Sequence, residues 1–208
     1  MLADDAAEAF FLKHQLNQKP LVVWLTGLSG AGKTTLACGV AFALRHKGYA
    51  VYVLDGDNLR DGLCRDLGFS ETDRAENLRR VGEVARLMVD AGLIVLASLI
   101  SPSVCARQAL RARFAPGQFA EVYVNTPLAV CERRDVKGLY TLARAGKLQQ
   151  FTGISAPYDA PEEPELTIDT SCRPLDDCVA EVLRFVVLQQ EALPASSSRL
   201  NPRVNLTT

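Results

Sequence analysis

The sequence predicts an α/β fold, in which a five-stranded, mainly parallel sheet carries helices on both faces. Short apolar runs alternate with longer amphipathic stretches, and the turns between them are short. The apolar runs are rich in Val, Ile and Leu and show little polar alternation, as expected for parallel strands that are buried on both sides. The predicted strands span residues 21–25, 49–54, 93–97, 121–124 and 166–168. The predicted helices span residues 33–47, 71–90, 104–114, 127–134 and 175–190.

Length and composition indicate one globular domain. The chain has 208 residues, of which 48% are hydrophobic and 23% charged, and this is enough for a single hydrophobic core. We predict that the domain covers residues 1–192, that residues 1–18 form a helix at its surface, and that residues 193–208 form a flexible tail. The net charge of −1 gives no overall attraction to anionic polymers, so we expect neither a nucleic-acid nor a membrane partner.

The cysteines and the N-terminal segment indicate a reducing compartment. Six cysteines are dispersed along the chain without a CxxC pair, and a chain of this length does not need disulfides. The first residues include Asp4, Asp5 and Glu8 instead of a basic segment followed by an apolar one, so no signal peptide is expected. No apolar run approaches the ~20 residues of a membrane span. We therefore predict a cytoplasmic protein with reduced thiols.

The strongest motif is Gly-Leu-Ser-Gly-Ala-Gly-Lys-Thr at residues 27–34, which matches the phosphate-loop pattern G-x-x-x-x-G-K-[ST]. It lies between the first predicted strand and the first predicted helix, where a nucleotide loop belongs. The glycines allow successive backbone N–H groups to surround a phosphate, and the helix N-terminus adds a partial positive charge. The alternative, a glycine-rich structural turn, is disfavoured because both the residues and their position match. The motif predicts a P-loop NTPase fold that binds a nucleoside triphosphate, with the Thr34 hydroxyl completing a magnesium shell.

Two aspartates follow the second predicted strand, at Asp55 and Asp57. The chain lacks the Asn-Lys-x-Asp motif of GTPases, and its central strand does not end in the carboxylate that motors and ATPases use. In an extended segment, residues two apart point the same way, so both carboxylates can face the phosphate loop. One would bind magnesium, and the other would accept a proton from an attacking hydroxyl; the two roles are interchangeable at this point. The alternative is a turn that caps the next helix.

Residues 137–164 predict a lid. They begin with a cationic stretch, continue with glycine and three prolines, and are too long for a passive connection. A phosphate loop, an acidic pair and a basic lid are typical of small-molecule kinases, because phosphoryl transfer depends on cations and on exclusion of water. Arg60 and Arg74 are candidates for binding an anionic acceptor, and Phe69 offers a stacking face, although each residue alone is commonly a solvated charge or a core aromatic.

Further runs extend these motifs and identify a family. They are DGDNLRDGL at 55–63, LGFS at 67–70, DRAENLRR at 73–80, ISP at 100–102, RDVKGLY at 134–140, ARAG at 143–146 and FTGI at 151–154. From about residue 19 to residue 184, the chain resembles the adenylylsulfate kinase (adenosine 5'-phosphosulfate kinase) family. The resemblance implies a stand-alone enzyme that transfers the γ-phosphate of ATP to the 3'-hydroxyl of adenylylsulfate. It also implies a homodimer and, as a possible partner, sulfate adenylyltransferase.

The resemblance also assigns roles to individual residues. ATP would be bound by Gly27, Leu28, Ser29, Gly30, Ala31, Gly32, Lys33, Thr34 and Thr35. Adenylylsulfate would be bound by Asp57, Asn58, Arg60, Phe69, Arg74, Asn77, Ile100, Ser101, Lys137 and Phe151. Thr34 and Asp55 would hold magnesium, and the catalytic residues would be Lys33, Asp57, Ser101 and Arg144. Leu99 and Ser155 depart from the family pattern, where Phe and Asp are usual, which affects packing beside the adenine and hydrogen bonding in the lid.

Two of these assignments keep alternatives. The family convention makes Ser101 a phosphoserine intermediate, and hence the chain a phosphoprotein, but the sequence shows no dedicated histidine to activate it, so direct transfer with Ser101 as a hydrogen-bonding contact is favoured. Arg144 is expected to reach the transferring phosphate when the lid closes. Arg134 and Lys137 would assist it, with a solvated helix face as the alternative, and Arg134 has Asp135 or Glu132 as potential ion-pair partners.

Two other functions remain open from the sequence. One is a P-loop kinase for a different small metabolite, such as a sugar acid or a nucleoside. The other is a nucleotide-binding module that regulates sulfate activation without turnover, which the intact Lys33, Asp55 and Asp57 disfavour.

Overall fold

The computed structural model describes residues 16–191. Five strands within this range form one parallel sheet. The strand order is β2-β3-β1-β4-β5, and every neighbouring pair is parallel. The strands are β1 (Leu21–Thr26), β2 (Val51–Asp55), β3 (Ile94–Ser98), β4 (Phe119–Val124) and β5 (Leu166–Ile168). All five predicted strands are therefore present, with ends that differ by two residues at most.

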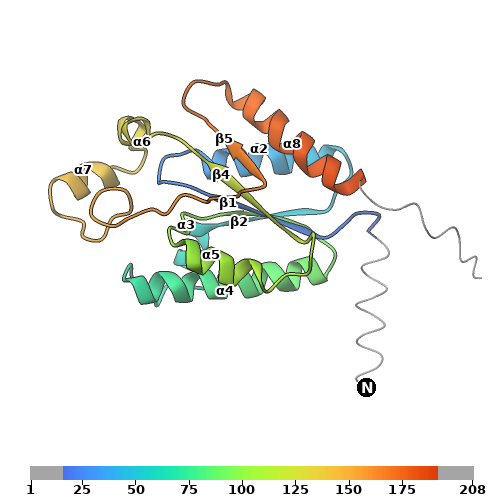
Figure 1. Ribbon diagram of the computed structural model, residues 1–208, viewed down its shortest axis with the longest axis horizontal. Helices are drawn as coiled ribbons and strands as arrows, with labels where there is room; N and C mark the ends of the chain where they lie inside the picture. Colours follow the sequence, from blue (N-terminus) through green and yellow to red (C-terminus); the bar gives the residue numbers. More distant parts are fainter. Residues whose placement is uncertain (1–15, 192–208) are drawn as a thin grey trace, which may run out of the picture.

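Helices cover both faces of the sheet, as predicted (Figure 1). They are α2 (Lys33–His46), α3 (Gly56–Asp61), α4 (Glu71–Asp90), α5 (Val104–Arg111), α6 (Leu128–Arg134), α7 (Leu139–Arg144) and α8 (Leu175–Glu191). Helices α2 and α8 pack together on one face, and α4 and α5 pack on the other. The predicted C-terminal tail and residues 1–15 of the predicted N-terminal helix lie outside the described residues. Residues 16–18, the described end of that predicted helix, are not helical. No helix within 16–191 is long and apolar enough to cross a bilayer.

Strand β1 is the centre of the sheet and is buried along its whole length. Its side chains alternate between two apolar clusters. Leu21, Val23 and Leu25 pack toward α2 and α8, whereas Val22 and Trp24 pack toward α4 and α5. Burial of each such side chain stabilises the fold by about 1.5–3 kcal/mol, so an unbroken apolar strand at this position is what the three-layer arrangement requires.

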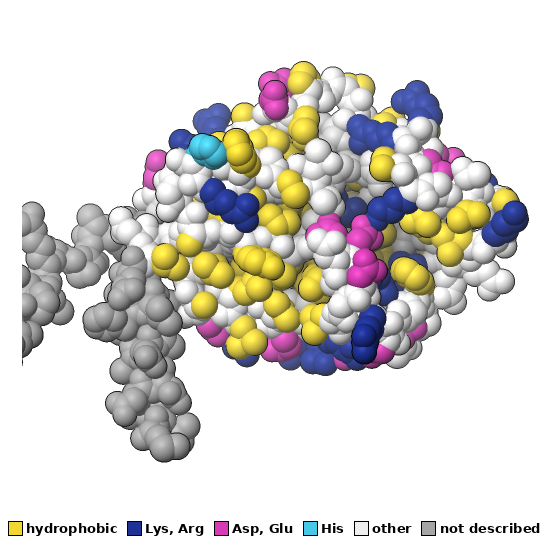
Figure 2. All heavy atoms as spheres, turned by 180° about the vertical axis from the view of Figure 1, so that it is seen from behind, with side chains coloured by type: hydrophobic (Ala, Val, Ile, Leu, Met, Phe, Trp, Pro, Cys, Tyr) yellow, Lys and Arg dark blue, Asp and Glu magenta, His cyan; other side chains and the backbone are white. Residues whose placement is uncertain are grey.

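The parallel strands bring several loops to one edge of the sheet. Leu25 and Asp55 both pair with Ser98 in the strand register, so β1, β2 and β3 end side by side. Ligands bind at this carboxyl edge in open α/β sheets. Figure 2 shows the molecule from behind. Basic and acidic side chains lie next to one another near the middle of that view, and apolar side chains are exposed over a separate area.

Candidate active site

A cavity of about 630 Å³ lies at the carboxyl edge of the sheet, and its volume is typical of small-molecule sites. The phosphate loop and the start of α2 line one end. The residues that follow β2, helix α4 and the turn after β3 line the other, and the beginning of the lid contacts both. Many predicted site residues line it: Ser29, Gly30, Gly32, Lys33, Thr34, Thr35, Asp55, Asp57, Arg60, Phe69, Arg74, Asn77, Ile100, Ser101, Lys137 and Phe151. Gly27, Leu28, Ala31, Asn58 and Arg144 are outside this lining.

Glycines give the phosphate loop its shape. Gly27 has a φ of +150°, and a Cβ there would lie 2.6 Å from the Val124 carbonyl oxygen, so no other residue fits without a shift of β4. Gly32 has a left-handed φ of +96° and precedes α2 without any side-chain cap. The first N–H groups of α2 therefore stay available for an anion.

Lys33 is buried and folds back onto the loop. Its Nζ donates to the carbonyl oxygens of Gly27 (3.0 Å) and Leu28 (2.8 Å). Burial lowers the pKa of Lys33 to about 8, although Cys131 and Asp57 partly counter this effect. A phosphate group beside Nζ would supply negative charge and raise the pKa of Lys33 again.

Asp55 caps helix α3 and also contacts the end of the phosphate loop. Its Oδ1 accepts from the backbone N–H groups of Asp57 (3.0 Å) and Asn58 (3.3 Å) and thereby caps α3. Its Oδ2 accepts from the Thr34 hydroxyl at 2.7 Å, and that hydroxyl also lies 3.1 Å from Ser98 Oγ. One carboxylate thus begins a helix and contacts the end of the phosphate loop at the same time.

The oxygen atoms of Thr34 and Asp55 fit a magnesium ion that is bound mainly by ATP. Among residues 16–191 there is no cluster of three or more His, Cys, Asp or Glu side chains suited to a metal. Mg²⁺ commonly takes only one or two protein ligands and completes its shell with substrate phosphates and water. A hydroxyl and a carboxylate in contact beside the phosphate loop match that requirement.

Asp57 lies in the first turn of α3 and contacts the lid. Its Oδ2 forms an ion pair with Lys137 Nζ, and both side chains line the cavity. Because both side chains are largely exposed, the pair contributes little to stability. A ligand that attracts Lys137 would therefore release Asp57 readily.

Two arginines hold an exposed aromatic ring at the other end of the cavity. The Arg60 and Arg74 guanidinium carbons lie 4.4 Å and 6.0 Å from the Phe69 ring centre. Arg74 also donates to the Phe69 carbonyl oxygen at 2.9 Å and to Thr152 Oγ1 at 2.7 Å, so it links α4 to the lid. Burial lowers the pKa of both guanidinium groups, and Arg60 lowers that of Arg74 further. This end of the cavity therefore favours an anion.

Asn77 lies in α4, one turn after Arg74, and is 6% exposed. Its Nδ2 is buried and has no hydrogen-bond partner, although the residue lines the cavity. Buried polar groups nearly always have a partner, so an unpaired donor beside a cavity points to a ligand acceptor.

Ser101 is buried in the turn that follows β3 and has a left-handed φ of +40°. Its hydroxyl donates to Thr26 Oγ1 and accepts from Trp24 Nε1, both at 3.0 Å. Neither partner is a base that would remove its proton. The geometry supports a contact role and gives no support to a nucleophile.

Arg134, which was expected only to assist Arg144, lies over the phosphate loop, whereas Arg144 does not. Arg134 donates to the Gly30 carbonyl oxygen (3.1 Å) and to Thr170 Oγ1 (3.0 Å) and lines the cavity. Arg144 is outside the cavity lining, and its predicted contact with the phosphate after lid closure stays a prediction. Arg144 ends α7, its side chain is 58% exposed, and it pairs with Glu132 at 2.6 Å.

The cavity also contains residues that the sequence did not suggest. Thr170 and Arg173 follow β5 and line its phosphate-loop end. Their position after the fifth predicted strand could have identified them, because β5 is parallel to β4 and ends at the same edge of the sheet.

The predicted lid at 137–164 is ordered and anchored. Tyr140 donates to the Ser29 carbonyl oxygen at 2.9 Å and packs edge-on against Phe151, with ring centres 5.0 Å apart. Ser155 Oγ accepts from the Phe151 N–H at 2.9 Å, so the residue that departs from the family pattern still closes the lid turn. Leu99, the other departure, is buried against Gly56.

Comparison with known proteins gives one consistent family. Residues 19–169 match the family model described as adenylylsulphate kinase. An adenylyl-sulfate kinase of Shewanella sp. (strain W3-18-1) is 61% identical over 168 residues, which are 81% of this chain and 80% of that protein. An APS kinase of Mycobacterium tuberculosis, solved in complex with AMPPNP and APS, is 48% identical with a TM-score of 0.78, over 81% of this chain and 98% of that one. A hexameric APS kinase from Thiobacillus denitrificans is 31% identical with a TM-score of 0.61, over 84% of this chain and 29% of that one. The chain therefore belongs to the adenylylsulfate kinase family.

Proposed function

We propose that the protein is an ATP-dependent adenylylsulfate kinase, which transfers the γ-phosphate of ATP to the 3'-hydroxyl of adenylylsulfate. The products are 3'-phosphoadenylylsulfate and ADP. One observation carries the proposal: a single cavity joins a phosphate loop to a second anion-binding end, where Arg60 and Arg74 flank the exposed ring of Phe69. An acceptor with both an aromatic base and an anionic group uses all of these features. A neutral sugar or nucleoside offers no negative charge to the two arginines.

The ATP end needs little rearrangement. Backbone N–H groups of the loop and of the first turn of α2 surround the phosphates, and Lys33 exchanges its carbonyl partners for phosphate oxygens. Thr34 and Asp55 would hold the magnesium ion, which neutralises charge on the β- and γ-phosphates when it is bound.

Asp57 is the residue that orients or deprotonates the attacking 3'-hydroxyl. Asp55 already uses one oxygen to cap α3 and the other to bind Thr34, whereas Asp57 is held only by Lys137 among the described contacts. Lys137 would leave Asp57 when phosphate groups enter the cavity, and the carboxylate would then accept a proton or a hydrogen bond.

ADP release, measured with adenylylsulfate added or withheld, tests the proposal. ATP and Mg²⁺ stay constant, and a sugar acid and a nucleoside serve as control acceptors. Release that depends on adenylylsulfate and yields 3'-phosphoadenylylsulfate is the expected result. Binding of ATP without turnover would favour the regulatory module, and turnover with a control acceptor alone would favour the other metabolite kinase.

Several finer properties are proposed from the resemblance. They are a homodimer, association with sulfate adenylyltransferase, a cytoplasmic location and direct transfer without a phosphoserine. Light scattering at several concentrations measures the assembly, and the hexameric relative makes a larger oligomer the competing outcome. Incubation with labelled ATP in the absence of acceptor tests the last property, and we expect no label on Ser101.

A further inference from the structure

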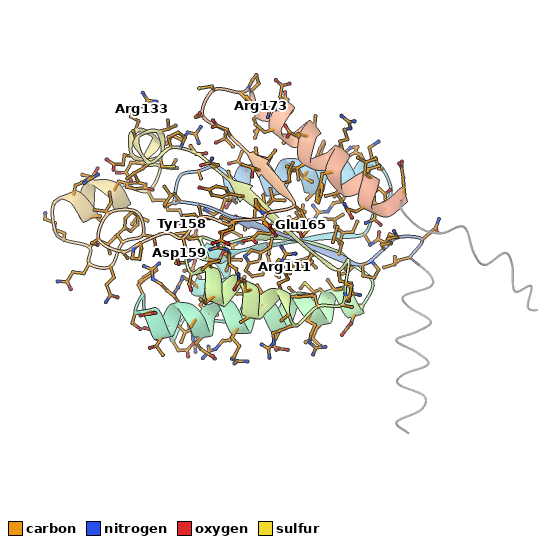
Figure 3. The ribbon with its side chains drawn as sticks, in the orientation of Figure 1. Arg111, Arg133, Tyr158, Asp159, Glu165 and Arg173 are labelled. Atoms are coloured by element: carbon orange, nitrogen blue, oxygen red, sulfur yellow. The ribbon has the colours of Figure 1, made fainter. Side chains whose placement is uncertain are left out.

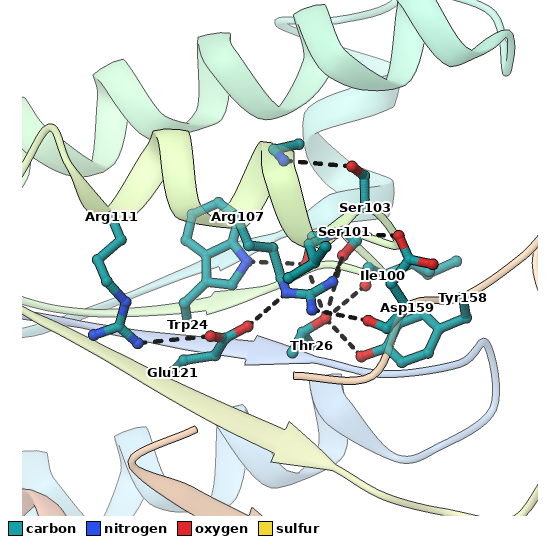
Figure 4. Close-up of polar contacts among 12 residues, drawn as sticks. Trp24, Thr26, Ile100, Ser101, Ser103, Arg107, Arg111, Glu121, Tyr158 and Asp159 are labelled. Atoms are coloured by element: carbon teal, nitrogen blue, oxygen red, sulfur yellow. Dashed lines mark hydrogen bonds and ion pairs between the residues drawn. The ribbon is translucent and has the colours of Figure 1, made fainter. Parts of the chain in front are cut away.

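Arg107 is a buried cation that no step of the proposed reaction uses. It lies in α5, is 2% exposed, and is outside the cavity lining. Its three guanidinium nitrogens donate to three separate segments (Figure 4). Nε donates to Glu121 Oε1 in β4 at 2.6 Å, Nη1 to the Ser101 carbonyl oxygen at 2.8 Å, and Nη2 to the Asp159 carbonyl oxygen at 2.8 Å. Only the planar guanidinium offers donors in this arrangement, and lysine does not.

The bond to Ser101 holds a strained residue. A left-handed φ is unfavourable for serine and persists only where the surroundings determine it. Trp24 and Thr26 hold the Ser101 hydroxyl, and Arg107 holds the carbonyl oxygen of the same residue. Arg107 therefore sets the direction of the peptide that joins Ser101 to Pro102, and both of these residues line the cavity.

The bond to Asp159 holds residues 156–161 of the lid beside the same turn. Asp159 N–H donates to the Pro102 carbonyl oxygen at 2.9 Å, and the Tyr158 hydroxyl lies 2.9 Å from Thr26 Oγ1. Figure 3 shows Tyr158 and Asp159 next to one another close to the sheet. A few residues earlier, Thr152 receives the hydrogen bond from Arg74. One guanidinium thus joins two segments that approach the acceptor end of the cavity.

We propose that Arg107 is a positioning residue for the acceptor site, which it shapes by holding the 100–102 turn and residues 156–161 in one fixed relation. The inference rests on the proposed function. Arg107 makes none of the described contacts with the phosphate loop, so its effect falls on adenylylsulfate and leaves ATP unaffected. A purely structural ion pair with Glu121 would lower stability but would not separate the two substrates.

Arg107→Lys tests this proposal, with Arg111→Lys as its matched control. Arg111 lies one turn later in α5 and binds Glu165 at 2.5 Å and Glu121 at 3.6 Å, but it contacts neither Ser101 nor Asp159. We expect Arg107→Lys to raise the KM for adenylylsulfate by about tenfold or more and to leave the KM for ATP within about twofold. We expect Arg111→Lys to change neither value.

A double variant, Arg107→Met with Glu121→Met, covers the case in which Arg107→Lys folds poorly. Replacing both members of a buried ion pair by apolar residues of similar size commonly preserves stability, yet this change removes the bonds to Ser101 and Asp159. Trp24 is the only tryptophan of the chain and donates to Ser101, so its fluorescence reports the turn directly. We expect an altered emission spectrum and weaker adenylylsulfate binding in a variant that still folds.

The outcomes separate the proposal from the function on which it rests. Unchanged adenylylsulfate KM in a folded Arg107→Lys or double variant overturns the positioning role, and so does an equal rise of both KM values. Absence of adenylylsulfate-dependent turnover in the unchanged protein overturns the proposed function, and this inference with it.

Discussion

The two ends of the cavity are built in different ways. The phosphate-loop end is built mainly on one continuous segment between β1 and α2, shaped by glycine backbone and by a lysine bound to its own loop, with Arg134 and Thr170 beside it. The acceptor end is assembled from side chains of α3, α4, the turn after β3 and the lid. A local segment is complete as soon as it folds, whereas the assembled end depends on long-range contacts such as that of Arg74 with Thr152. Substitutions should therefore affect the two ends separately.

The largest effect is expected from Asp57→Asn. The amide keeps the size of the side chain but cannot accept a proton, so kcat should fall by about 100-fold to 10,000-fold. ATP affinity should stay nearly unchanged, because Asp57 belongs to the acceptor side. Coupled ADP release and nucleotide titration measure the two quantities. Asp61→Asn, in the same helix but outside the cavity lining, is the control. Near-normal turnover in Asp57→Asn would remove Asp57 from the reaction.

Arg74→Ala should separate the two substrates. Loss of a charged hydrogen-bonding group costs about 1.5–3 kcal/mol, which corresponds to a rise in the adenylylsulfate KM of roughly 10-fold to 150-fold. The KM for ATP should stay within about twofold. Arg79→Ala is the control, since Arg79 also lies in α4 but pairs with Glu76 at the surface. If both KM values rose together, the division into two ends would be wrong.

ATP affinity should fall as the pH rises above about 8. In the free protein Lys33 loses its proton near that pH, since burial lowers its pKa to about 8. Bound phosphates favour the ammonium form, so binding above this pH takes up a proton and weakens by up to about tenfold per pH unit. Below pH 8 the lysine is already charged, and this contribution is constant.

Calorimetric titrations in buffers of different ionisation enthalpy measure the proton uptake by Lys33. Lys33→Arg stays charged over the whole range and should lose this pH dependence, even where its affinity is lower. Equal ATP affinity of the unchanged protein at pH 7 and pH 9.5 would contradict the assignment.

The smallest effects should distinguish the two arginines near the lid. Arg134→Ala removes contacts above the phosphate loop and should weaken ATP binding several-fold, by about 1 kcal/mol. Arg144→Ala removes an exposed ion pair with Glu132, which is worth about 0–1 kcal/mol, and should change kcat by less than about twofold. Steady-state kinetics of the Arg134→Ala and Arg144→Ala variants show which arginine contributes to ATP binding and which to kcat. A large loss of kcat in Arg144→Ala would restore it as the cation that reaches the phosphate after closure.

The contrast between the two ends also explains what the sequence could reveal. The P-loop fold and the five strands were predictable, because parallel buried strands and the Gly-x-x-x-x-Gly-Lys-Thr pattern are local signals. Helices α3 and α7 have six residues each, and such short pieces carry no periodic pattern. Arg134 and Arg144 are both basic residues near the lid, and only folding shows which one turns toward the phosphate loop. Arg107 belongs to none of the sequence motifs, because its three partners lie in separate segments that only folding brings together.

Asp55 has a consequence for how this enzyme can change over time. Because the same carboxyl group caps α3 and receives the Thr34 hydroxyl, a substitution there would disturb the donor half and the acceptor half in one step. Kinetic data from such a variant would mix both effects, whereas Thr34→Val alters only the donor half. Selection for a new acceptor must therefore act on residues farther along α3 and α4, with Asp55 retained.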